Sequence, residues 1–147
     1  MHRWLSLLLV AGCRHGGAAT PAPREDDLAL LAHPWKVYGH VLSDKSAVND
    51  DEATELDGRE VAITAAGFES PWQGTCEDYG RSKRTRLLVE VASELSITRA
   101  GLGLGERVIE FRLICQNKRS PPMTILVDPE RPHAVTCWNG ACYLLGH

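Results

Sequence analysis

The chain of 147 residues has little apolar sequence in long runs and no strong excess of one charge. Its first apolar run, Trp4 to Ala11, is too short to cross a bilayer as a helix. The formal net charge is -3. Loss of the first twelve residues would change it to -4, because Arg3 and its charge of +1 would be lost with them. This mildly acidic balance gives no reason to expect nucleic acid as a partner, and the length suits one domain.

Sequence signatures of common enzyme and cofactor sites are also missing. There is no G-x-S-x-G and no H-E-x-x-H. The glycines at 101, 103 and 105 fail the dinucleotide-binding spacing, because Glu106 occupies the last position. Glu77 and Asp78 are adjacent, so on a strand they would point to opposite sides. We therefore predict no catalytic residue, no cofactor and a protein that is not an enzyme.

The first residues have the layout of an export signal. A short positive start at Arg3 precedes the apolar run that ends at Ala11. The run leads into Val10-Ala11-Gly12-Cys13, which resembles the lipobox of bacterial lipoproteins. Two other interpretations are open: an ordinary export signal cleaved after Ala19, and an N-terminus that directs no export.

The lipobox resemblance implies that residues 1–12 are a signal peptide and that Cys13 becomes an acylated N-terminus carrying chains such as palmitate. Several chains would hold the protein on a membrane, because each buried methylene contributes about 0.8 kcal/mol. Arg14 follows the cysteine where an aspartate would favour the inner membrane in this family. The resemblance therefore implies a lipid-anchored envelope protein on the outer membrane, facing the periplasm.

The rest of the chain divides into a tether and one domain. Residues 13–32 are predicted to be the lipidated N-terminus and a flexible tether, rich in Gly, Ala and Pro, in which Asp27 to Ala32 can form a short helical turn. Residues 33–147 are predicted to be a β-rich globular domain. Within this domain, Asn49 and Glu52 have the spacing of a capping box, and Gly58 is a residue at which a helix can end. These residues predict one short helix with Ala53 and Leu56 facing inward.

Alternation of apolar and polar residues predicts that most of the domain is β-structure. Trp35 to Leu42 has the aromatic and β-branched content of a strand. Period-two runs follow over residues 60–65, 86–98, 109–116 and 123–127. Many short strands with little helix predict a mainly β fold, a small antiparallel barrel or sandwich with one short helix and disulfide links.

Four cysteines remain after Cys13, and an even number suits an oxidising compartment. Four cysteines allow three pairings. Asn-Gly at 139–140 indicates a two-residue hairpin loop, which would set Cys137 opposite Cys142 where the strands lie closest. We therefore predict Cys137–Cys142 and, as the remainder, Cys76–Cys115. A zinc site is the alternative, but the spacing has no matching second pair, so we predict no metal.

Two surface features are candidates for a partner. The C-terminal hairpin is apolar on both faces, so either it is buried on both sides or the face with Trp138 and Tyr143 meets a protein; Trp72 lies among turn formers and is a second candidate. The basic run Arg81 to Arg86 could contact phosphates, lipid headgroups or anionic cell-wall polymer, although a solvated loop is the favoured interpretation.

The size, disulfides, tether and strand pattern loosely resemble small periplasmic lipoprotein inhibitors of cell-wall hydrolases. None of the recognition motifs of those inhibitors occurs, so no functional residue is transferred. The resemblance implies a non-enzymatic binding module that inhibits or sequesters a cell-wall hydrolase or another periplasmic protein. The alternative is a structural accessory lipoprotein of an envelope or secretion assembly. A small-molecule ligand and the oligomeric state stay open.

Overall fold

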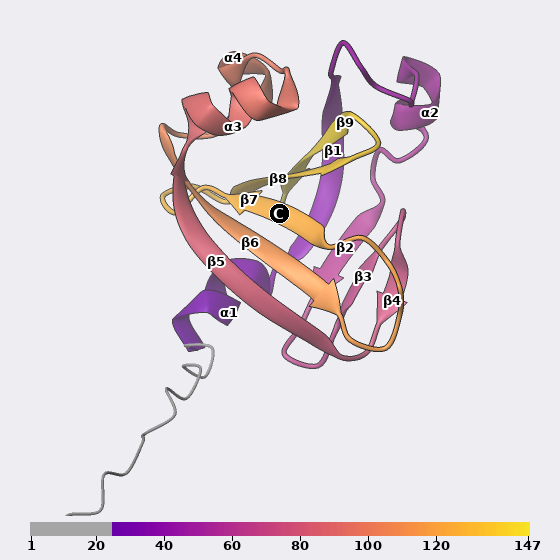
Figure 1. The fold of residues 1–147 in the computed structure, drawn as a ribbon, viewed down its shortest axis with the longest axis vertical. Coiled ribbons are helices and arrows are strands. Elements are labelled where there is room, and N and C mark those ends of the chain that lie inside the picture. The colour runs from indigo at the N-terminus through magenta and orange to yellow at the C-terminus, as the bar shows by residue number, and fades with distance from the viewer. Residues whose placement is uncertain (1–24) are drawn as a thin grey trace, which may run out of the picture.

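The computed structural model describes residues 25–147, and Cys13 with the lipobox-like segment lies outside the described residues. Nine antiparallel strands form one sheet that curls into a nearly closed barrel (Figure 1). This confirms the predicted mainly β, antiparallel fold. The strand order is β4-β3-β2-β1-β9-β8-β7-β6-β5.

The strands and helices are short. The strands are β1 (Pro34–Leu42), β2 (Glu60–Ile63), β3 (Phe68–Ser70), β4 (Gly74–Cys76), β5 (Tyr79–Leu87), β6 (Arg107–Cys115), β7 (Met123–Val127), β8 (His133–Trp138) and β9 (Ala141–Gly146). The helices in the described part are α1 (Glu25–Leu31), α2 (Asp50–Thr54), α3 (Leu88–Leu95) and α4 (Arg99–Leu102). In α2 the predicted capping box is present: the Glu52 N–H donates to Asn49 Oδ1 at 2.9 Å, and the Asn49 N–H donates to Glu52 Oε2 at 3.0 Å.

The barrel closes where its two edge strands meet. β4 ends at Cys76, and the chain enters β5 after two residues, although β4 and β5 are not hydrogen-bonded neighbours in the described sheet. The Cys76–Cys115 disulfide joins β4 to β6 with the Cα atoms 5.8 Å apart. The Tyr79 hydroxyl donates to the Thr64 carbonyl at 2.6 Å. Chain connectivity, a disulfide and side-chain hydrogen bonding therefore hold this seam.

α1 connects the beginning of β1 with β5. Leu31 is fully buried in the core, and the Trp35 indole N–H donates to the Leu31 carbonyl at 2.9 Å. Asp27, which is also buried, pairs with Lys83 of β5. Packed structure therefore begins N-terminal to residue 33, inside the segment that we expected to belong to the tether.

Apolar side chains pack in two layers because successive strand residues point to opposite faces. The inner layer fills the barrel with large side chains such as Trp35, Phe111 and Tyr143. The outer layer lies between the sheet and the pair α3 and α4, and consists of Leu88, Val91, Ala92, Leu102, Leu104, Val108, Leu126, Val135 and Cys142. β7, β8 and β9 contribute to both layers. The C-terminal hairpin is thus buried on both sides, which was one of the two expected possibilities.

The prediction of a strand over residues 86–98 is wrong beyond Leu87, where β5 ends and α3 begins without a loop. Leu88, Val91, Ala92 and Leu95 also recur at helical spacing. The segment forms a helix because the apolar side of that helix covers the apolar outer face of the sheet. Leu88, Val91 and Ala92 are thereby buried. Tertiary packing therefore decides between two periodicities that overlap in the sequence.

The favoured interpretation of residues 81–86 as a solvated loop is also wrong. They form most of β5, whose nine residues pair with β6 from Tyr79 opposite Cys115 to Leu87 opposite Arg107. β5 is an edge strand, and charged side chains on an edge strand hinder pairing with other chains. The basic run is therefore compatible with a strand, since within the described residues β5 has a neighbouring strand on one side only.

Both predicted disulfides are present. Cys137 pairs with Cys142 beside a turn in which Asn139 and Gly140 both have positive φ, as a type I′ hairpin loop requires. The Cys76–Cys115 bridge joins residues 39 apart in sequence, whereas Cys137–Cys142 joins residues 5 apart. The longer bridge removes more conformational freedom from the unfolded chain.

We expect the two bridges to contribute unequally to stability. In the chain-entropy model, replacing Cys76 and Cys115 by alanine lowers the free energy of unfolding by about 4 kcal/mol, and replacing Cys137 and Cys142 by about 2 kcal/mol. Urea denaturation of the two double variants measures both losses, and each serves as the control for the other. Equal losses, or a greater loss for the hairpin bridge, would contradict the barrel-closing role of Cys76–Cys115.

Candidate functional site

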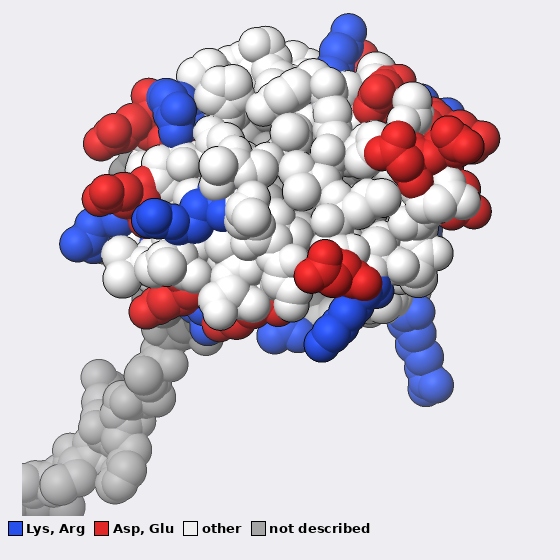
Figure 2. All heavy atoms as spheres, turned by 90° about the horizontal axis from the view of Figure 1, so that it is seen from above, with Lys and Arg blue, Asp and Glu red and all other residues white. Residues whose placement is uncertain are grey.

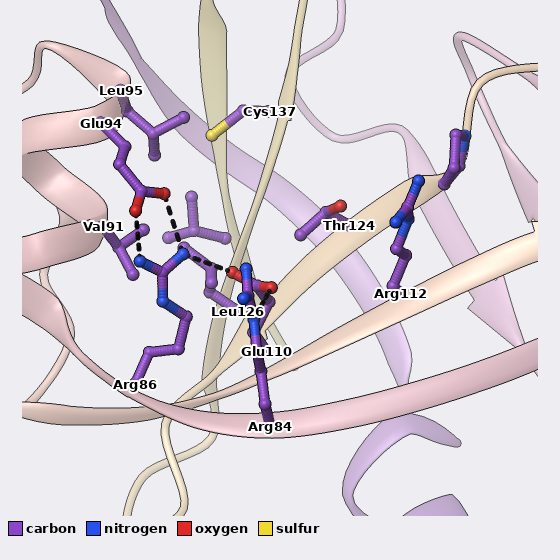
Figure 3. A pocket seen from close by; sticks show the side chains of 12 residues that line it. Arg84, Arg86, Val91, Glu94, Leu95, Glu110, Arg112, Thr124, Leu126 and Cys137 are labelled. Atoms are coloured by element: carbon purple, nitrogen blue, oxygen red, sulfur yellow. Dashed lines mark hydrogen bonds and ion pairs between the residues drawn. The ribbon is translucent and has the colours of Figure 1, made fainter.

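A pocket of about 390 Å³ opens on the outer face of strands β5 to β8, beside α3 (Figure 3). Its floor includes a cross-strand row: Arg84 lies opposite Glu110, Glu110 opposite Leu126, and Leu126 opposite Val135. The side chains of this row, one from each of four strands, are thus charged at the edge of the barrel and apolar beneath α3. The full lining is Arg84, Arg86, Val91, Glu94, Leu95, Glu110, Arg112, Pro122, Thr124, Leu126, Val135 and Cys137.

The charged wall of the pocket is a network of two arginines and two carboxylates. Arg84 Nε donates to Glu110 Oε1 at 2.6 Å, and Arg86 Nη1 donates to Glu110 Oε2 at 3.1 Å and to Glu94 Oε2 at 2.8 Å. Arg86 also pairs with the second Glu94 oxygen through Nη2. The Arg86 and Glu110 side chains are 10% and 12% exposed, so this pair lies largely out of solvent. The network fixes α3 to β5 and β6.

Hydrogen bonding within this network shifts two pKa values. The hydrogen bond from Arg86 lowers the pKa of Glu94 below its ordinary value of 4.5, against the effect of burial, which raises it. Hydrogen bonds to Glu94 and Glu110 raise the pKa of Arg86 above its already high ordinary value. Both residues are therefore charged at neutral pH, and the wall carries a fixed pattern of opposite charges.

The opposite side of the pocket is less fully paired. Arg112 of β6 is exposed, and none of the ion pairs among the side chains of residues 27–147 involves it. Thr124 of β7 lies directly across from it in the register. Figure 3 shows Arg112 on the side of the pocket away from α3, with Arg86 and Glu94 beside the helix. This side therefore offers a guanidinium that pairs with no carboxylate among the described side chains.

The apolar part of the floor lies between these two sides. Leu126 and Val135 are at most 3% exposed, and the partly buried Leu95 packs against the same outer layer. Cys137 lines the pocket with the sulfur that is bonded to Cys142. Apolar walls with a few polar groups are typical of ligand sites, and about 300–1,000 Å³ is their usual volume.

A buried carboxylate outside the pocket has a structural role. Asp128 is 4% exposed and accepts hydrogen bonds from the Gly105 N–H, the Glu130 N–H and Arg131 Nε, each at 2.9 Å. Burial alone would raise the pKa of Asp128, but these hydrogen bonds outweigh it and lower the pKa. Asp128 thereby joins the loop before β6 to the turn after β7.

The residues predicted to form a partner surface differ in exposure. Tyr143 is 1% exposed and stacks on Trp72 with ring centroids 4.9 Å apart, so it belongs to the core and not to the surface. Burial raises the pKa of Tyr143, with a further contribution from the charge of Glu52. Trp72 and Trp138 are partly buried and pack against the inner layer. Only the two tryptophans can therefore reach a partner without unfolding.

The pocket is not among the features predicted from the sequence. Arg84 and Arg86 belong to the predicted basic run, whereas Glu94, Glu110 and Arg112 are not among the predicted site residues. The available signal was the helical spacing of Leu88, Val91, Ala92 and Leu95, which places a helix next to a strand with arginines at alternate positions. The register of four strands is still needed to bring these residues together.

Among the side chains that the structure describes, residues 27–147, no group of three or more His, Cys, Asp or Glu is arranged to hold a metal ion. In the same part of the chain, no helix has the length and apolar character needed to cross a membrane. Comparison with known proteins finds no matching family model, no matching curated protein and no matching solved structure.

The Arg86–Glu94 pair predicts a pH-dependent stability. A carboxyl group whose pKa is lowered by folding contributes stability above its unfolded-state pKa, and this contribution is lost as the pH falls through the folded-state value. We expect Glu94→Gln to lower the free energy of unfolding at neutral pH, and the difference from the wild type to shrink as the pH falls below 4.5, the ordinary pKa of a glutamate. Urea denaturation at several pH values measures this difference.

Glu90→Gln is the control, because Glu90 is an exposed acidic residue on the same helix without an ion pair among the described residues. We expect this variant to track the wild type at every pH. A Glu94→Gln variant with the wild-type pH profile would contradict the role of the pair.

Proposed function

We propose that this protein is an envelope lipoprotein, anchored through Cys13, whose barrel is a non-enzymatic binding domain outside the cytoplasm. The pairing of the cysteines carries the proposal. The domain joins Cys76 to Cys115 and Cys137 to Cys142, and disulfides persist mainly in oxidising compartments. This pairing uses four of the five cysteines and leaves none as a partner for Cys13, which suits acylation of its thiol.

An anchor at Cys13 would keep the domain near the membrane. Only residues 14–24 separate it from Glu25, where α1 begins. A chain of this length spans at most about 40 Å when fully extended. A partner would therefore have to be an envelope component, such as a cell-wall hydrolase that works close to the membrane.

The end of the molecule with α2, α3 and α4 offers a surface for such a partner. Figure 2 views this end and shows a broad uncharged area, with acidic side chains gathered on the side where α2 lies. The cores of protein interfaces are depleted in charged residues and enriched in aromatic ones. The β8–β9 turn packs against the loop after β1, and Trp138 leads into this turn. We propose that this end, with Trp138 beside it, contacts the partner.

The anchor can be tested by two substitutions that separate a lipobox from an ordinary signal. Cys13→Ala should abolish incorporation of an alkyne-labelled palmitate analogue and move the protein out of the membrane fraction. Ala19→Arg is the matched control, because it removes the small residue at the alternative cleavage site and should leave labelling unchanged. Mass spectrometry should find an acylated Cys13 as the first residue. Processing after Ala19, or full-length chain with free thiols in the cytosol, would contradict the proposal.

The binding role can be tested on cell-wall hydrolysis. We expect the full-length protein to bind a soluble cell-wall hydrolase at a 1:1 ratio and to slow the clearing of a cell-wall suspension. Ala47→Arg should weaken this inhibition about tenfold, which corresponds to about 1.4 kcal/mol. Ala47 is exposed, and its N–H donates to the Asn139 carbonyl at 2.9 Å, so the new charge lies beside the β8–β9 turn.

Ala65→Arg is the control, because Ala65 is equally exposed but lies in the turn between β2 and β3. Inhibition that responds equally to both substitutions would reject the proposed surface. Absence of inhibition, together with co-purification in a membrane complex, would favour the structural accessory role.

A further inference from the structure

We propose that the pocket beside α3 binds an amphipathic anion, a carboxylate or phosphate carried on an aliphatic chain. This inference deepens the proposed function by naming the ligand class of the pocket. The inference rests on the proposed function only because it requires that the domain binds a ligand. It does not depend on the acylation of Cys13 or on the inhibition of a hydrolase.

Charge balance in the pocket favours an anion. Three arginines and two glutamates line it, which leaves a net charge of +1. Arg84 and Arg86 are occupied by Glu110 and Glu94, so the excess positive charge falls on Arg112. A guanidinium presents parallel N–H donors that match the two oxygens of a carboxylate or phosphate.

The neighbourhood of Arg112 suits the same headgroup. Thr124, opposite Arg112 on β7, carries a hydroxyl that can donate to an anion. Both residues lie on paired strands, so their backbones are fixed before a ligand arrives. A preformed site loses less free energy on binding, because less chain has to be ordered.

The remaining lining suits an aliphatic chain. In Figure 3, Leu95, Leu126 and Cys137 lie on the α3 side of Thr124 and Arg112. Val135 lies opposite Leu126 in the register, and Pro122 also lines the pocket. A ligand with its anion at Arg112 could direct its chain toward the helix and cover these apolar groups. Removal of this apolar surface from water favours such an orientation of the chain. A cationic headgroup would instead meet the positive charge of Arg112, with which no carboxylate of the described side chains pairs.

The ligand class can be tested with simple amphiphiles below their micelle concentrations. The oxidised full-length protein is titrated with octanoate, octyl phosphate, octanol and octyltrimethylammonium, by calorimetry and by amide chemical shifts. We expect one site for each anion, at least about tenfold tighter than for the alcohol or the cation. Arg112→Gln should weaken anion binding at least about tenfold, and Arg112→Lys should keep part of the affinity.

Arg107→Gln is the matched control, because Arg107 is an exposed arginine of the same strand that does not line the pocket. It should bind the anions as the wild type does. Equal binding by the Gln variants at 112 and 107, equal affinity for the cation, or no binding of either anion would each overturn the proposal.

The two anions separate carboxylate from phosphate chemistry, and vesicles containing phosphatidylglycerol test whether a membrane lipid is a source of the phosphate. Binding of octyl phosphate with no effect of the vesicles would identify a free ligand. Because palmitate labelling and hydrolase inhibition do not involve Arg112, they would remain intact if the pocket bound neither anion, and the two proposals can fail separately.

Discussion

Strands β7 to β9 carry apolar side chains on both faces, and the rest of the architecture depends on this constraint. β7 places Ile125 in the inner layer and Leu126 in the outer one, and β9 places Tyr143 inside and Cys142 outside. A sheet with one wet face needs cover on one side only, whereas these strands need it on both. Burying one large aliphatic side chain contributes about 1.5–3 kcal/mol, so neither face can be left in water. Curling of the sheet covers the inner face, and α3 with α4 covers the outer one.

The position and size of the pocket follow from how little cover α3 provides. The helix has eight residues and is therefore about 12 Å long. It begins directly at the end of β5, and its stripe of Leu88, Val91 and Ala92 covers the outer layer near Val108 and Leu126. The parts of β6 and β7 that carry Arg112 and Thr124 lie beyond it. The pocket is the uncovered remainder of a face that is otherwise packed.

Features that depend on nearby residues could be predicted from the sequence. The Asn139-Gly140 turn fixes which residues of the last hairpin face each other, so it gave the Cys137–Cys142 pair, and the remaining pair followed by elimination. The capping box of α2 is equally local. The mainly β class followed from alternation along several segments. Each of these features is decided by spacing along a few residues.

Features that depend on distant packing could not be predicted in the same way. Residues 86–98 fit a strand and a helix, and only the apolar outer face of β6 to β9 selects the helix. The basic run at 81–86 is part of an edge strand that pairs with β6, which begins about twenty residues later in the chain. The residues within the run do not reveal this distant partner. The pocket requires both outcomes together with the register of four strands, so its residues could not be grouped from the sequence.

The disulfide Cys137–Cys142 contributes both to the stability of the domain and to the lining of the pocket. Its sulfur at Cys137 forms part of the pocket floor, while Cys142 is buried in the outer layer beneath the helices. The β8–β9 turn holds the same strands together by backbone geometry, and the bridge adds a covalent link between them. Its effect is to fix the separation of the two side chains on the outer face, next to Val135 and Leu144. Oxidation of this one pair of thiols therefore affects the shape of the apolar floor as well as the stability of the domain.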